Sequence, residues 1–288
     1  MNIGFFGMGI MGRPMALNLQ AAGHTLIVPE RASLPADIRA VAEVHADPAA
    51  VAAKSEVVVM ILPDTPDVEA ALFGPHGFAP ALKPGTLVID MSSISPAATR
   101  GFAERITSAG CDWLDAPVSG GEVGAKAASL TIMCGGTEAA FARALPLLQL
   151  MGKTINLVGD AGAGQTTKVA NQMIVAANIM AVSEALTFAK KSGVDPEKLR
   201  QALLGGFASS RILEVHGKRM TDRTFAPGFR IRLHQKDLAL AIAAARDLAL
   251  ALPGVALAQQ MFSACVAHGG ADDDHSGMVK AVERASGV

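Results

Sequence analysis

Short apolar runs alternate with helical patterns through the first half of the chain. The apolar runs have the length of strands, and several of them end at Gly, Pro or Asp. They cover residues 2–6, 25–28, 56–62, 86–90, 112–118, 130–134 and 154–158. Between them, apolar positions recur at helical spacing over residues 10–22, 66–72, 97–109 and 138–148. This alternation predicts an α/β domain of the Rossmann-like, doubly wound type, with helices on both faces of a mostly parallel sheet.

The pattern changes after about residue 164, where strand-like runs stop. Helical patterns follow over residues 166–192, 196–204, 209–219, 235–251 and 255–268. We therefore predict a dinucleotide-binding domain over residues 1–163 and an all-α substrate and oligomerisation domain over residues 164–288. The helix over residues 166–192 would be about 40 Å long, enough to join the two domains.

The composition favours a soluble enzyme. Residues 169–186 are the most apolar stretch, but polar residues interrupt it, so we expect a buried helix and no membrane span. The net charge of −1 provides no basic field for nucleic acid. The three cysteines are widely spaced and form no metal-ligand cluster, so we expect no metal. The segment after Met1 lacks the features of a secretory signal, which favours the cytoplasm.

A glycine motif follows the first predicted strand and opens the first predicted helix. Gly7, Gly9 and Gly12 have the spacing of the dinucleotide-binding fingerprint. In that fingerprint the first glycine permits the tight turn, the second lets the backbone approach a pyrophosphate, and the third lets helix and strand pack closely. The helix start offers free N–H groups to the phosphates. The candidate cofactor-binding residues here are Phe6, Gly7, Met8, Gly9, Ile10, Met11 and Gly12.

The end of the second predicted strand bears on the choice between NAD and NADP. Glu30 lies 23 residues after Gly7, roughly where this fold holds the adenosine ribose hydroxyls with a carboxylate. Arg31 follows at once, and an arginine in this place holds a 2′-phosphate, so NADP stays open. Because a carboxylate repels a 2′-phosphate, we expect NADH to be the preferred reduced cofactor.

Lysine is the better candidate for the acid that a hydride transfer needs. The chain contains no tyrosine and no set of zinc ligands, which excludes two common dehydrogenase arrangements. A glycine-rich loop leads to Lys168 in the first turn of the long predicted helix, and Asn171 and Gln172 follow on the same face. A lysine in a dry pocket or beside another cation donates a proton near neutral pH. The alternative is a polar patch between domains; His216 and His234 are kept for supporting roles.

A further glycine pair indicates a place for a substrate carboxylate. Ser119, Gly120 and Gly121 follow a predicted strand at the carboxyl edge of the sheet, where doubly wound folds bind ligands. One hydroxyl and two N–H groups would form a small nest for an anion there. A plain turn is the alternative interpretation.

Four segments, spread in order over nearly the whole chain, resemble the signatures of the β-hydroxyacid dehydrogenase family. They are the N-terminal glycine motif and residues 115–121, 162–171 and 236–238. The resemblance implies that Lys168 is the catalytic acid and base, and that Asn171 orients the substrate or the lysine. It also implies that Ser119, Gly120 and Gly121 bind the substrate carboxylate. The residues that it implies on the cofactor side are Leu62, Pro63, Ser93 and Lys236.

Two departures from the family pattern affect these expectations. Gln172 stands where many relatives carry a second Asn, so a side-chain amide remains but its reach differs by one methylene. The triplet Glu30-Arg31-Ala32 stands where many NADP-using relatives carry Asn-Arg-Thr, which supports NAD over NADP.

Within the family, three segments are similar to the members that reduce tartronate semialdehyde (2-hydroxy-3-oxopropanoate) to glycerate. These segments are residues 90–96, 205–213 and 227–238. A 3-hydroxyisobutyrate dehydrogenase, or a broad semialdehyde or glyoxylate reductase, would share the same machinery. A non-catalytic cofactor-binding module is a remote alternative, because the lysine and the glycine loop are both intact. The resemblance also implies a homodimer or a homotetramer, whose symmetry the sequence leaves open.

Overall fold

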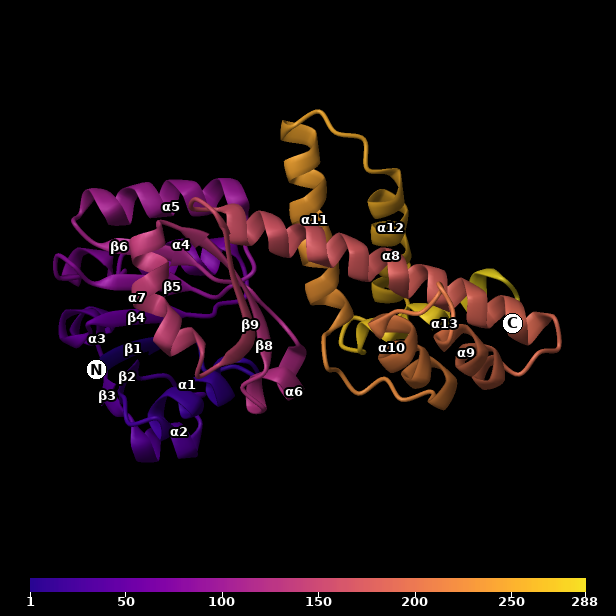
Figure 1. The fold of residues 1–288 in the computed structure, drawn as a ribbon, viewed down its shortest axis with the longest axis horizontal. Coiled ribbons are helices and arrows are strands. Elements are labelled where there is room, and N and C mark those ends of the chain that lie inside the picture. Colours follow the sequence, from indigo (N-terminus) through magenta and orange to yellow (C-terminus); the bar gives the residue numbers. More distant parts are fainter. The chain divides into compact units, whose positions relative to one another are not determined.

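The structure is a computed structural model that describes residues 1–288, and these form two compact units, Met1–Lys168 and Val169–Val288. The first is an α/β unit and the second is helical (Figure 1), which confirms the predicted fold class. The strands are β1 (Asn2–Phe6), β2 (Thr25–Pro29), β3 (Glu43–His45), β4 (Val57–Met60), β5 (Leu87–Asp90), β6 (Asp112–Asp115), β7 (Val118–Ser119), β8 (Leu130–Gly136) and β9 (Gly152–Gly159). The helices of the first unit are α1 (Gly12–Ala21), α2 (Ala36–Val41), α3 (Pro48–Lys54), α4 (Thr65–Phe73), α5 (Pro96–Ser108), α6 (Gly121–Lys126) and α7 (Glu138–Leu148), with a 3-10 turn η1 (Ala79–Ala81).

All strands belong to one sheet in the order β3-β2-β1-β4-β5-β6-β8-β7, with β9 beside β8. The six strands from β3 to β6 in this order run parallel, whereas β8 is antiparallel to both β6 and β7. The prediction of a single strand over residues 112–118 was wrong. These residues form two strands, because Pro117 lacks the N–H group that would continue the ladder.

Both faces of the sheet are buried, which explains the unbroken apolar runs of its central strands. Val57 and Val59 of β4 point to one face and pack with residues of α1, α2 and α7. Val58 and Met60 point to the other face and pack with residues of α3, α4 and α5. The hydrophobic core of the first unit therefore consists of two layers, one on each side of the sheet.

Three short helices and one short strand were not predicted. Helices α2 and α6 have six residues each and α3 has seven, so none completes the two turns in which a periodic pattern becomes visible. Strand β3 has three residues. Local capping nevertheless marks α3, because the Asp47 carboxylate accepts a hydrogen bond from Ala49 N at 2.9 Å and Pro48 stands at the first helical position.

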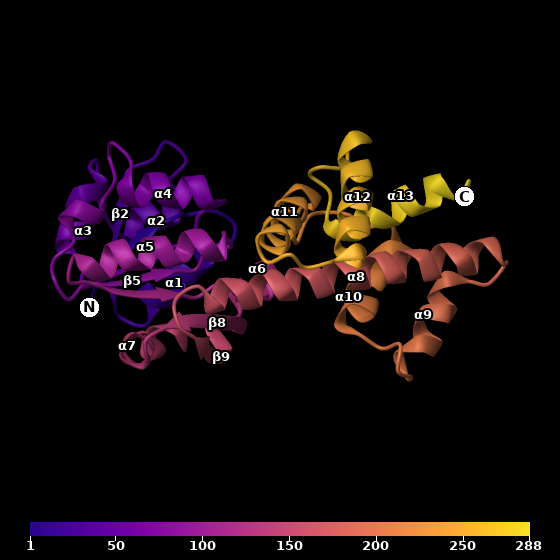
Figure 2. The same ribbon diagram turned by 90° about the horizontal axis from the view of Figure 1, so that it is seen from above.

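Helix α8 (Ala163–Lys191) begins in the first unit and forms the central helix of the second. The other elements of the second unit are α9 (Pro196–Leu204), α10 (Arg211–Asp222), α11 (Ile231–Asp247), α12 (Pro253–Ala267), the 3-10 turn η2 (His275–Gly277) and α13 (Met278–Ala285). Figure 2 shows α9 and α10 on one side of α8, and α11, α12 and α13 on the other.

Two expectations for the second unit need correction. The helix predicted over residues 235–251 runs instead from Ile231 to Asp247. Leu248 and Leu250 extended the apolar pattern, but they are 68% and 56% exposed, and Ala249 between them has a left-handed φ of 53°. The amphipathic C-terminal helix α13 (Met278–Ala285) was not predicted.

Helix α8 is the one helix whose length and composition would allow it to cross a membrane. Its most apolar window is 44% buried inside the structure. Val169, Ala176, Ile179, Val182 and Leu186 belong to the hydrophobic core of the second unit. The apolar face of α8 thus packs against the helices around it, as a core helix does.

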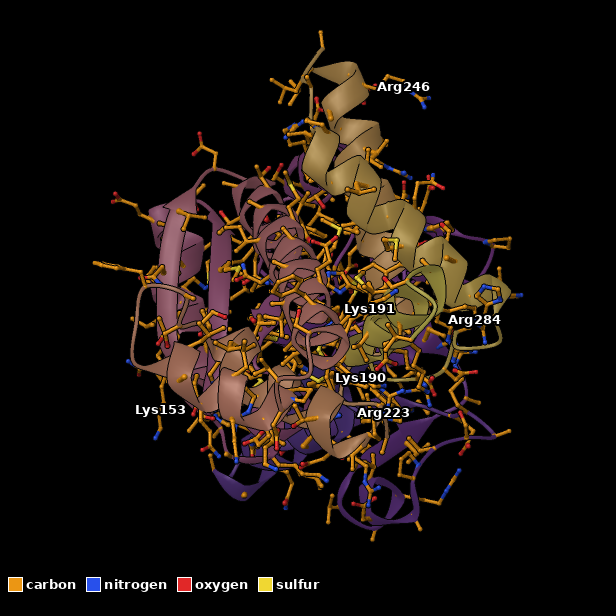
Figure 3. The ribbon with its side chains drawn as sticks, turned by 90° about the vertical axis from the view of Figure 1, so that its right-hand side faces the viewer. Lys153, Lys190, Lys191, Arg223, Arg246 and Arg284 are labelled. Carbon is orange, nitrogen blue, oxygen red and sulfur yellow. The ribbon has the colours of Figure 1, made fainter.

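Ion pairs hold the end of α8 to the C-terminal helix. Lys190 and Arg223 both contact the Glu283 carboxylate, at 3.3 and 2.9 Å. Lys191 donates a hydrogen bond of 2.6 Å to the carbonyl oxygen of Ser286. Figure 3 shows Lys190, Lys191 and Arg223 gathered at this end of the helix. The single acidic side chain of Glu283, on α13, thus connects this helix to α8 and to Arg223, the residue directly after α10.

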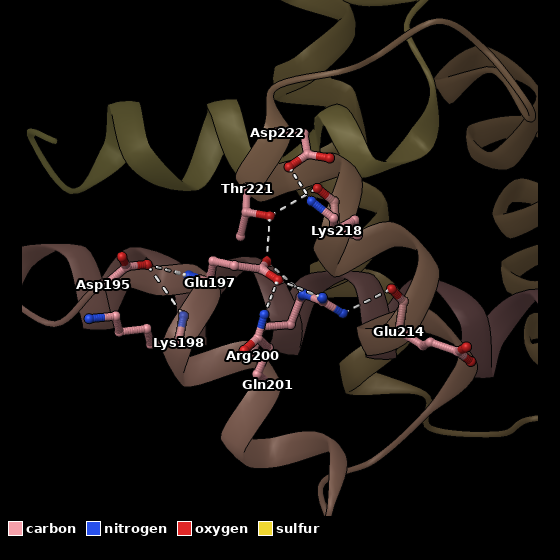
Figure 4. Close-up of polar contacts among 9 residues, drawn as sticks. All are labelled: Asp195, Glu197, Lys198, Arg200, Gln201, Glu214, Lys218, Thr221 and Asp222. Atoms are coloured by element: carbon pink, nitrogen blue, oxygen red, sulfur yellow. Dashed lines mark hydrogen bonds and ion pairs between the residues drawn. The ribbon is translucent and has the colours of Figure 1, made fainter.

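A second polar cluster joins α9 to α10 (Figure 4). The Glu197 carboxylate accepts hydrogen bonds from Arg200 Nε at 2.8 Å and Nη2 at 2.7 Å, and from Thr221 Oγ1 at 2.9 Å. Gln201 also donates to it, at 3.0 Å. The hydrogen bonds from Arg200, more than any other contact, lower the pKa of Glu197 from its ordinary value of 4.5 to about 2.

This cluster predicts acid sensitivity of the second unit. Because the pKa of Glu197 is depressed by folding, its stabilising effect is complete above about pH 5 and disappears as the pH falls from 4.5 toward 2. Glu197→Gln should lower the free energy of unfolding at pH 7 by about 1–2 kcal/mol, a discounted value because the carboxylate is partly exposed. Between pH 7 and pH 2.5, Glu197→Gln should also lose less stability than the wild type does, as measured by thermal unfolding at each pH. Glu184→Gln, at an exposed position of α8, is the control and should behave as the wild type.

Candidate active site

The carboxyl ends of four parallel strands lie in one row across the sheet. Phe6 pairs with Met60, Met60 with Asp90, and Asp90 with Asp115 in the parallel register. The segments that leave these strands carry most of the predicted site residues of the first unit. They are the glycine motif after β1, Leu62 and Pro63 after β4, Ser93 after β5, and Ser119, Gly120 and Gly121 after β6. The sheet therefore brings these segments to a single edge.

The glycine motif is shaped by two different demands. A Cβ on Gly7 would lie 2.1 Å from the carbonyl oxygen of Ile61, and Gly7 has a φ of +105°. A Cβ on Gly12 would lie 1.8 Å from the carbonyl oxygen of Gly7. A Cβ on Gly9, in contrast, would meet nothing within 4 Å. Gly7 and Gly12 are thus required by the protein's own packing, whereas Gly9 leaves open space in which a pyrophosphate can approach the backbone.

The three residues between these glycines differ in their exposure. Ile10 is 51% exposed, whereas Met8 and Met11 are half-buried against the core. They precede α1, whose first residue is Gly12. The residues present therefore fit a dinucleotide: an open glycine turn that leads directly into a helix N-terminus.

Glu30, at the end of β2, is held by a cation that sequence reasoning missed. Arg39 on α2 makes two hydrogen bonds of 2.6 Å to the two oxygens of the Glu30 carboxylate. This bidentate contact is the main cause that lowers the pKa of Glu30. Arg31 and Ser33 beside it are exposed. The end of β2 therefore carries one carboxylate that is paired with the Arg39 guanidinium, with the exposed Arg31 next to it in the chain.

Asp115 ties the start of α8 to the sheet. Its buried carboxylate accepts hydrogen bonds from the backbone N–H of Gly162 at 2.7 Å and of Gln165 at 2.9 Å. Burial raises the pKa of Asp115 to about 6, although these backbone N–H groups act in the opposite direction. A Cβ on Gly164 would lie 2.7 Å from Oδ2 of Asp115, so only glycine lets the helix approach this closely. The first turn of α8 is thus fixed against the end of β6.

Gln165 connects the same helix turn to the loop after β5. Its side chain donates a hydrogen bond of 2.7 Å to the carbonyl oxygen of Ser92 and accepts one of 3.1 Å from Ile94 N. These two contacts flank Ser93, a predicted residue of the nicotinamide side. The Ser92 hydroxyl in turn accepts a hydrogen bond of 2.9 Å from Leu62 N. The fully buried Gln165 thus joins the start of α8 to the loop after β5, and Ser92 of that loop contacts the segment after β4.

Lys168 lies three residues beyond Gln165 on α8, and is 7% exposed. Residues at this spacing share one face of a helix, so Lys168 follows Gln165 along the face that is tied to the sheet edge. The helix begins at Ala163, three residues before the predicted start. Lys168 therefore stands in the second turn of the helix, not in the first as expected, and Gly164 belongs to the helix itself.

The predicted carboxylate nest lies between a strand and a short helix. Ser119 ends β7, and Gly120 and Gly121 have φ values of +133° and +60°. Gly121 is also the first residue of α6. The Ser119 side chain is half-buried and Gly120 is exposed, so a ligand has access to this turn.

In the second unit, Asn171 and Gln172 on α8 are linked to α11. Asn171 Nδ2 donates a hydrogen bond of 2.8 Å to Oε1 of Gln172, and Gln172 Nε2 donates one of 2.6 Å to Oδ2 of Asp237. The other oxygen of Asp237 lies 2.9 Å from Nζ of Lys236. The predicted residues Asn171, Gln172 and Lys236 are thus brought into one polar network, with buried Asp237 at its centre.

Sequence reasoning missed Gln165, Arg39 and Asp237 as residues of the site. Asp237 adjoins Lys236 in a segment that the resemblance already marked, so its neighbourhood was a usable signal. Gln165 lies in the glycine loop, but its partners are 71 and 73 residues away in the chain. Arg39 is on a helix that the periodicity did not reveal.

Comparison with known proteins extends over both units. Residues 2–159 match the family model described as the NAD binding domain of 6-phosphogluconate dehydrogenase. Residues 162–282 match the one described as NAD-binding of NADP-dependent 3-hydroxyisobutyrate dehydrogenase. The chain is 54% identical over 284 residues to 2-hydroxy-3-oxopropionate reductase of Escherichia coli (strain K12), covering 98% of this chain and 97% of the relative.

Two further relatives also match over nearly the whole chain. The chain is 38% identical to 2-(hydroxymethyl)glutarate dehydrogenase of Eubacterium barkeri, over 99% of this chain and 96% of that protein. Its structure is similar to that of Mycobacterium tuberculosis 3-hydroxyisobutyrate dehydrogenase with L-serine, with a TM-score of 0.89, 33% identity and 98% coverage of both chains.

Proposed function

Because the chain belongs to the β-hydroxyacid dehydrogenases, a family of NAD(P)-dependent oxidoreductases, we propose that it reduces tartronate semialdehyde to glycerate. The observation that carries this choice of substrate is the 54% identity, over 98% of the chain, to a relative named for that reaction. The other relatives reported above have a lower sequence identity to this chain, and their names refer to other substrates.

Lys168 is the general acid of this proposal. The nicotinamide, when bound, supplies a hydride to the aldehyde carbon. Lys168 donates a hydrogen bond to the aldehyde oxygen and passes a proton to it as negative charge develops there. The anchoring of α8 by Asp115 and Gln165 supports this role, because it fixes the helix of Lys168 at the edge where the parallel strands end.

The other residues of the candidate site bind the substrate or the cofactor in this proposal. Ser119 Oγ and the N–H groups of Gly120 and Gly121 bind the substrate carboxylate. Asn171 orients the substrate, and Gln172 holds the Asn171 amide in place through their 2.8 Å hydrogen bond. Leu62, Pro63 and Ser93 line the nicotinamide side. Lys236 contributes to the cofactor, a role supported by the NAD-binding description that residues 162–282 match.

A substrate panel tests the proposed reaction. Oxidation of NADH and NADPH would be followed with tartronate semialdehyde, methylmalonate semialdehyde, succinic semialdehyde and glyoxylate. We expect the highest kcat/KM with tartronate semialdehyde. A higher value with methylmalonate semialdehyde would instead favour the 3-hydroxyisobutyrate dehydrogenase reaction, the activity in the name of a structural relative at 33% identity.

Glu30 is expected to set the cofactor preference, with NADH used better than NADPH. Glu30→Ala leaves the guanidinium groups of Arg39 and Arg31 without their carboxylate neighbour, so they become available to a 2′-phosphate. The ratio of kcat/KM for NADPH to that for NADH should rise about tenfold or more. Glu43→Ala, which removes an exposed carboxylate from the adjacent strand β3, is the matched control. A wild type that clearly prefers NADPH contradicts the assignment.

We also propose a cytoplasmic homodimer or homotetramer. Ile174 and Phe188 on α8 are 65% and 72% exposed, and large apolar side chains at such exposure favour a surface that another subunit covers. Light scattering coupled to size exclusion chromatography measures the subunit number directly.

A further inference from the structure

Three histidines that are distant in the sequence form a hydrogen-bonded chain inside the second unit. Nε2 of His234 on α11 lies 3.0 Å from the carbonyl oxygen of Gln172. Nδ1 of His234 lies 3.0 Å from Nδ1 of His275 in η2, and Nε2 of His275 lies 3.2 Å from Nε2 of His216 on α10. Nδ1 of His216 makes no hydrogen bond of ordinary geometry, but it lies 3.4 Å from Oδ1 of Asp274, within ion-pair distance.

Both ends of this chain accept hydrogen bonds and cannot donate them. The Gln172 carbonyl is an acceptor only, and an ionised carboxylate is an acceptor only. Asp274 is fully buried and ionised: it accepts hydrogen bonds from Gly228 N, Phe229 N and the Ser276 hydroxyl, and Arg219 lies 3.3 Å away. Burial alone would raise the pKa of Asp274, but the contacts of His216, His275 and Ser276 with the carboxylate outweigh it and lower the pKa.

The number of N–H groups that the three histidines need determines their total charge. The chain has four contacts, at Gln172, between His234 and His275, between His275 and His216, and at Asp274. Each of the three hydrogen bonds needs one N–H, and so does the contact with Asp274, because a ring nitrogen without its proton would set its lone pair against the carboxylate oxygen. Neutral imidazole rings supply one N–H apiece, so three rings fall one proton short of four. We propose that His216, His275 and His234 together hold this one additional proton, and that the charged chain makes them positioning residues for Gln172 and its partner Asn171.

The additional proton belongs at the Asp274 end of the chain. Burial is the main cause that lowers the pKa of His275 well below its usual range, and His234 is fully buried. His216 is the ring nearest the carboxylate, and its side chain is 18% exposed. The charges of His234, His216 and Arg219 also lower the pKa of His275, whereas that of Asp274 raises it. Protonated His216 donates to both Asp274 and His275, and every contact in the chain is then satisfied.

A bound metal ion is the competing interpretation of this cluster. Ligand atoms of His216, His275 and Asp274 lie within 4.8 Å of one another. Both oxygens of Asp274 already accept N–H or O–H groups, and the guanidinium of Arg219 would face the ion. The rings of His216 and His275 are also nearly perpendicular, at 82°, with centroids 4.4 Å apart, as in an edge contact. These contacts favour the proton.

The chain ends at a residue of the proposed site. Gln172 receives the His234 N–H at its carbonyl oxygen, while its side chain contacts both Asn171 and Asp237. His234 and Asp237 lie three residues apart on α11, so the histidine chain and the Asp237 carboxylate together fix α11 on this part of α8. This part of the inference rests on the proposed function, whereas the proton count does not.

Nitrogen NMR of the full chain tests the proton count without any substrate. In protein labelled with ¹⁵N-histidine, single His→Asn variants assign the signals of the seven histidines. At pH 7 we expect His234 to carry its proton on Nε2, His275 on Nδ1, and His216 on both nitrogens. Three neutral rings at pH 7 would overturn the proposal. So would zinc that remains bound after dialysis and removes these signals.

Enzyme kinetics test the positioning role. In the wild type, kcat/KM for the semialdehyde should fall over the pH range in which NMR shows His216 losing its second proton. His216→Asn should be about two- to tenfold less active at neutral pH and should lack this pH dependence. His216→Gln, checked for folding by circular dichroism, should behave in the same way. Exposed His268→Asn is the control. A wild-type pH profile in both His216 variants would overturn the positioning role, and an enzyme inactive on the whole substrate panel would refute the proposed function only.

Discussion

Lys168→Ala is expected to lower turnover by about 10²–10⁴-fold, the usual contribution of a positioned general acid. The reason is chemical, because the aldehyde oxygen then loses the group that protonates it as the hydride arrives. Cofactor binding should be retained, since the glycine turn and Glu30 are untouched. Steady-state kinetics with tartronate semialdehyde, together with a fluorescence titration of NADH, measures both effects.

Two further variants make this experiment specific. Lys168→Arg keeps a positive charge but replaces the ammonium with a guanidinium, which hardly ever releases its proton, so it should be almost as slow. Lys153→Ala removes an exposed lysine of β9 and should leave turnover unchanged. Wild-type turnover in Lys168→Ala would remove this lysine from the mechanism.

The next largest effects are expected at two glycines of the same motif. Gly12→Ala places a Cβ 1.8 Å from the carbonyl oxygen of Gly7 and 2.7 Å from Cγ2 of Ile61. Because a backbone oxygen cannot move aside, we expect a loss of about 3 kcal/mol in the free energy of unfolding. Urea denaturation of the two proteins measures this loss.

Gly9→Ala is the matched variant, with the opposite pattern. Its Cβ meets no protein atom within 4 Å, so the stability should stay within about 0.5 kcal/mol of the wild type. The same methyl group would stand in the space offered to the pyrophosphate, so NADH should bind about tenfold more weakly, a change of about 1.4 kcal/mol. If Gly9→Ala binds NADH as the wild type does, the pyrophosphate does not lie over this turn.

The family and the fold class were accessible from sequence because their signals are local. The glycine motif, the lysine segment and residues 236–238 are short segments, and the comparisons with known proteins confirm the family that they indicated. The exchange of strand-like for helical periodicity near residue 164 likewise separated an α/β part from a helical part. Such patterns depend on neighbours within one or two turns, and the chain itself displays them.

Some boundaries were wrong where local pattern and tertiary structure disagree. The pattern of residues 235–251 placed α11 four residues late, because the apolar Leu248 and Leu250 lie outside the helix and are exposed. The early start of α8 has a tertiary cause as well. The Asp115 carboxylate, 50 residues away, accepts the N–H of Gln165 at the helix start.

The sequence alone determined which chemical groups this protein has: an open glycine turn, one lysine with an amide pair beyond it, and a carboxylate with an arginine after β2. Only the tertiary structure decided which groups are held together. It joined Gln165 to the loop after β5, Arg39 to Glu30, and three histidines to Asp274. The physical reason is that periodicity reports burial along one element, whereas buried polar groups must find partners wherever the fold brings them.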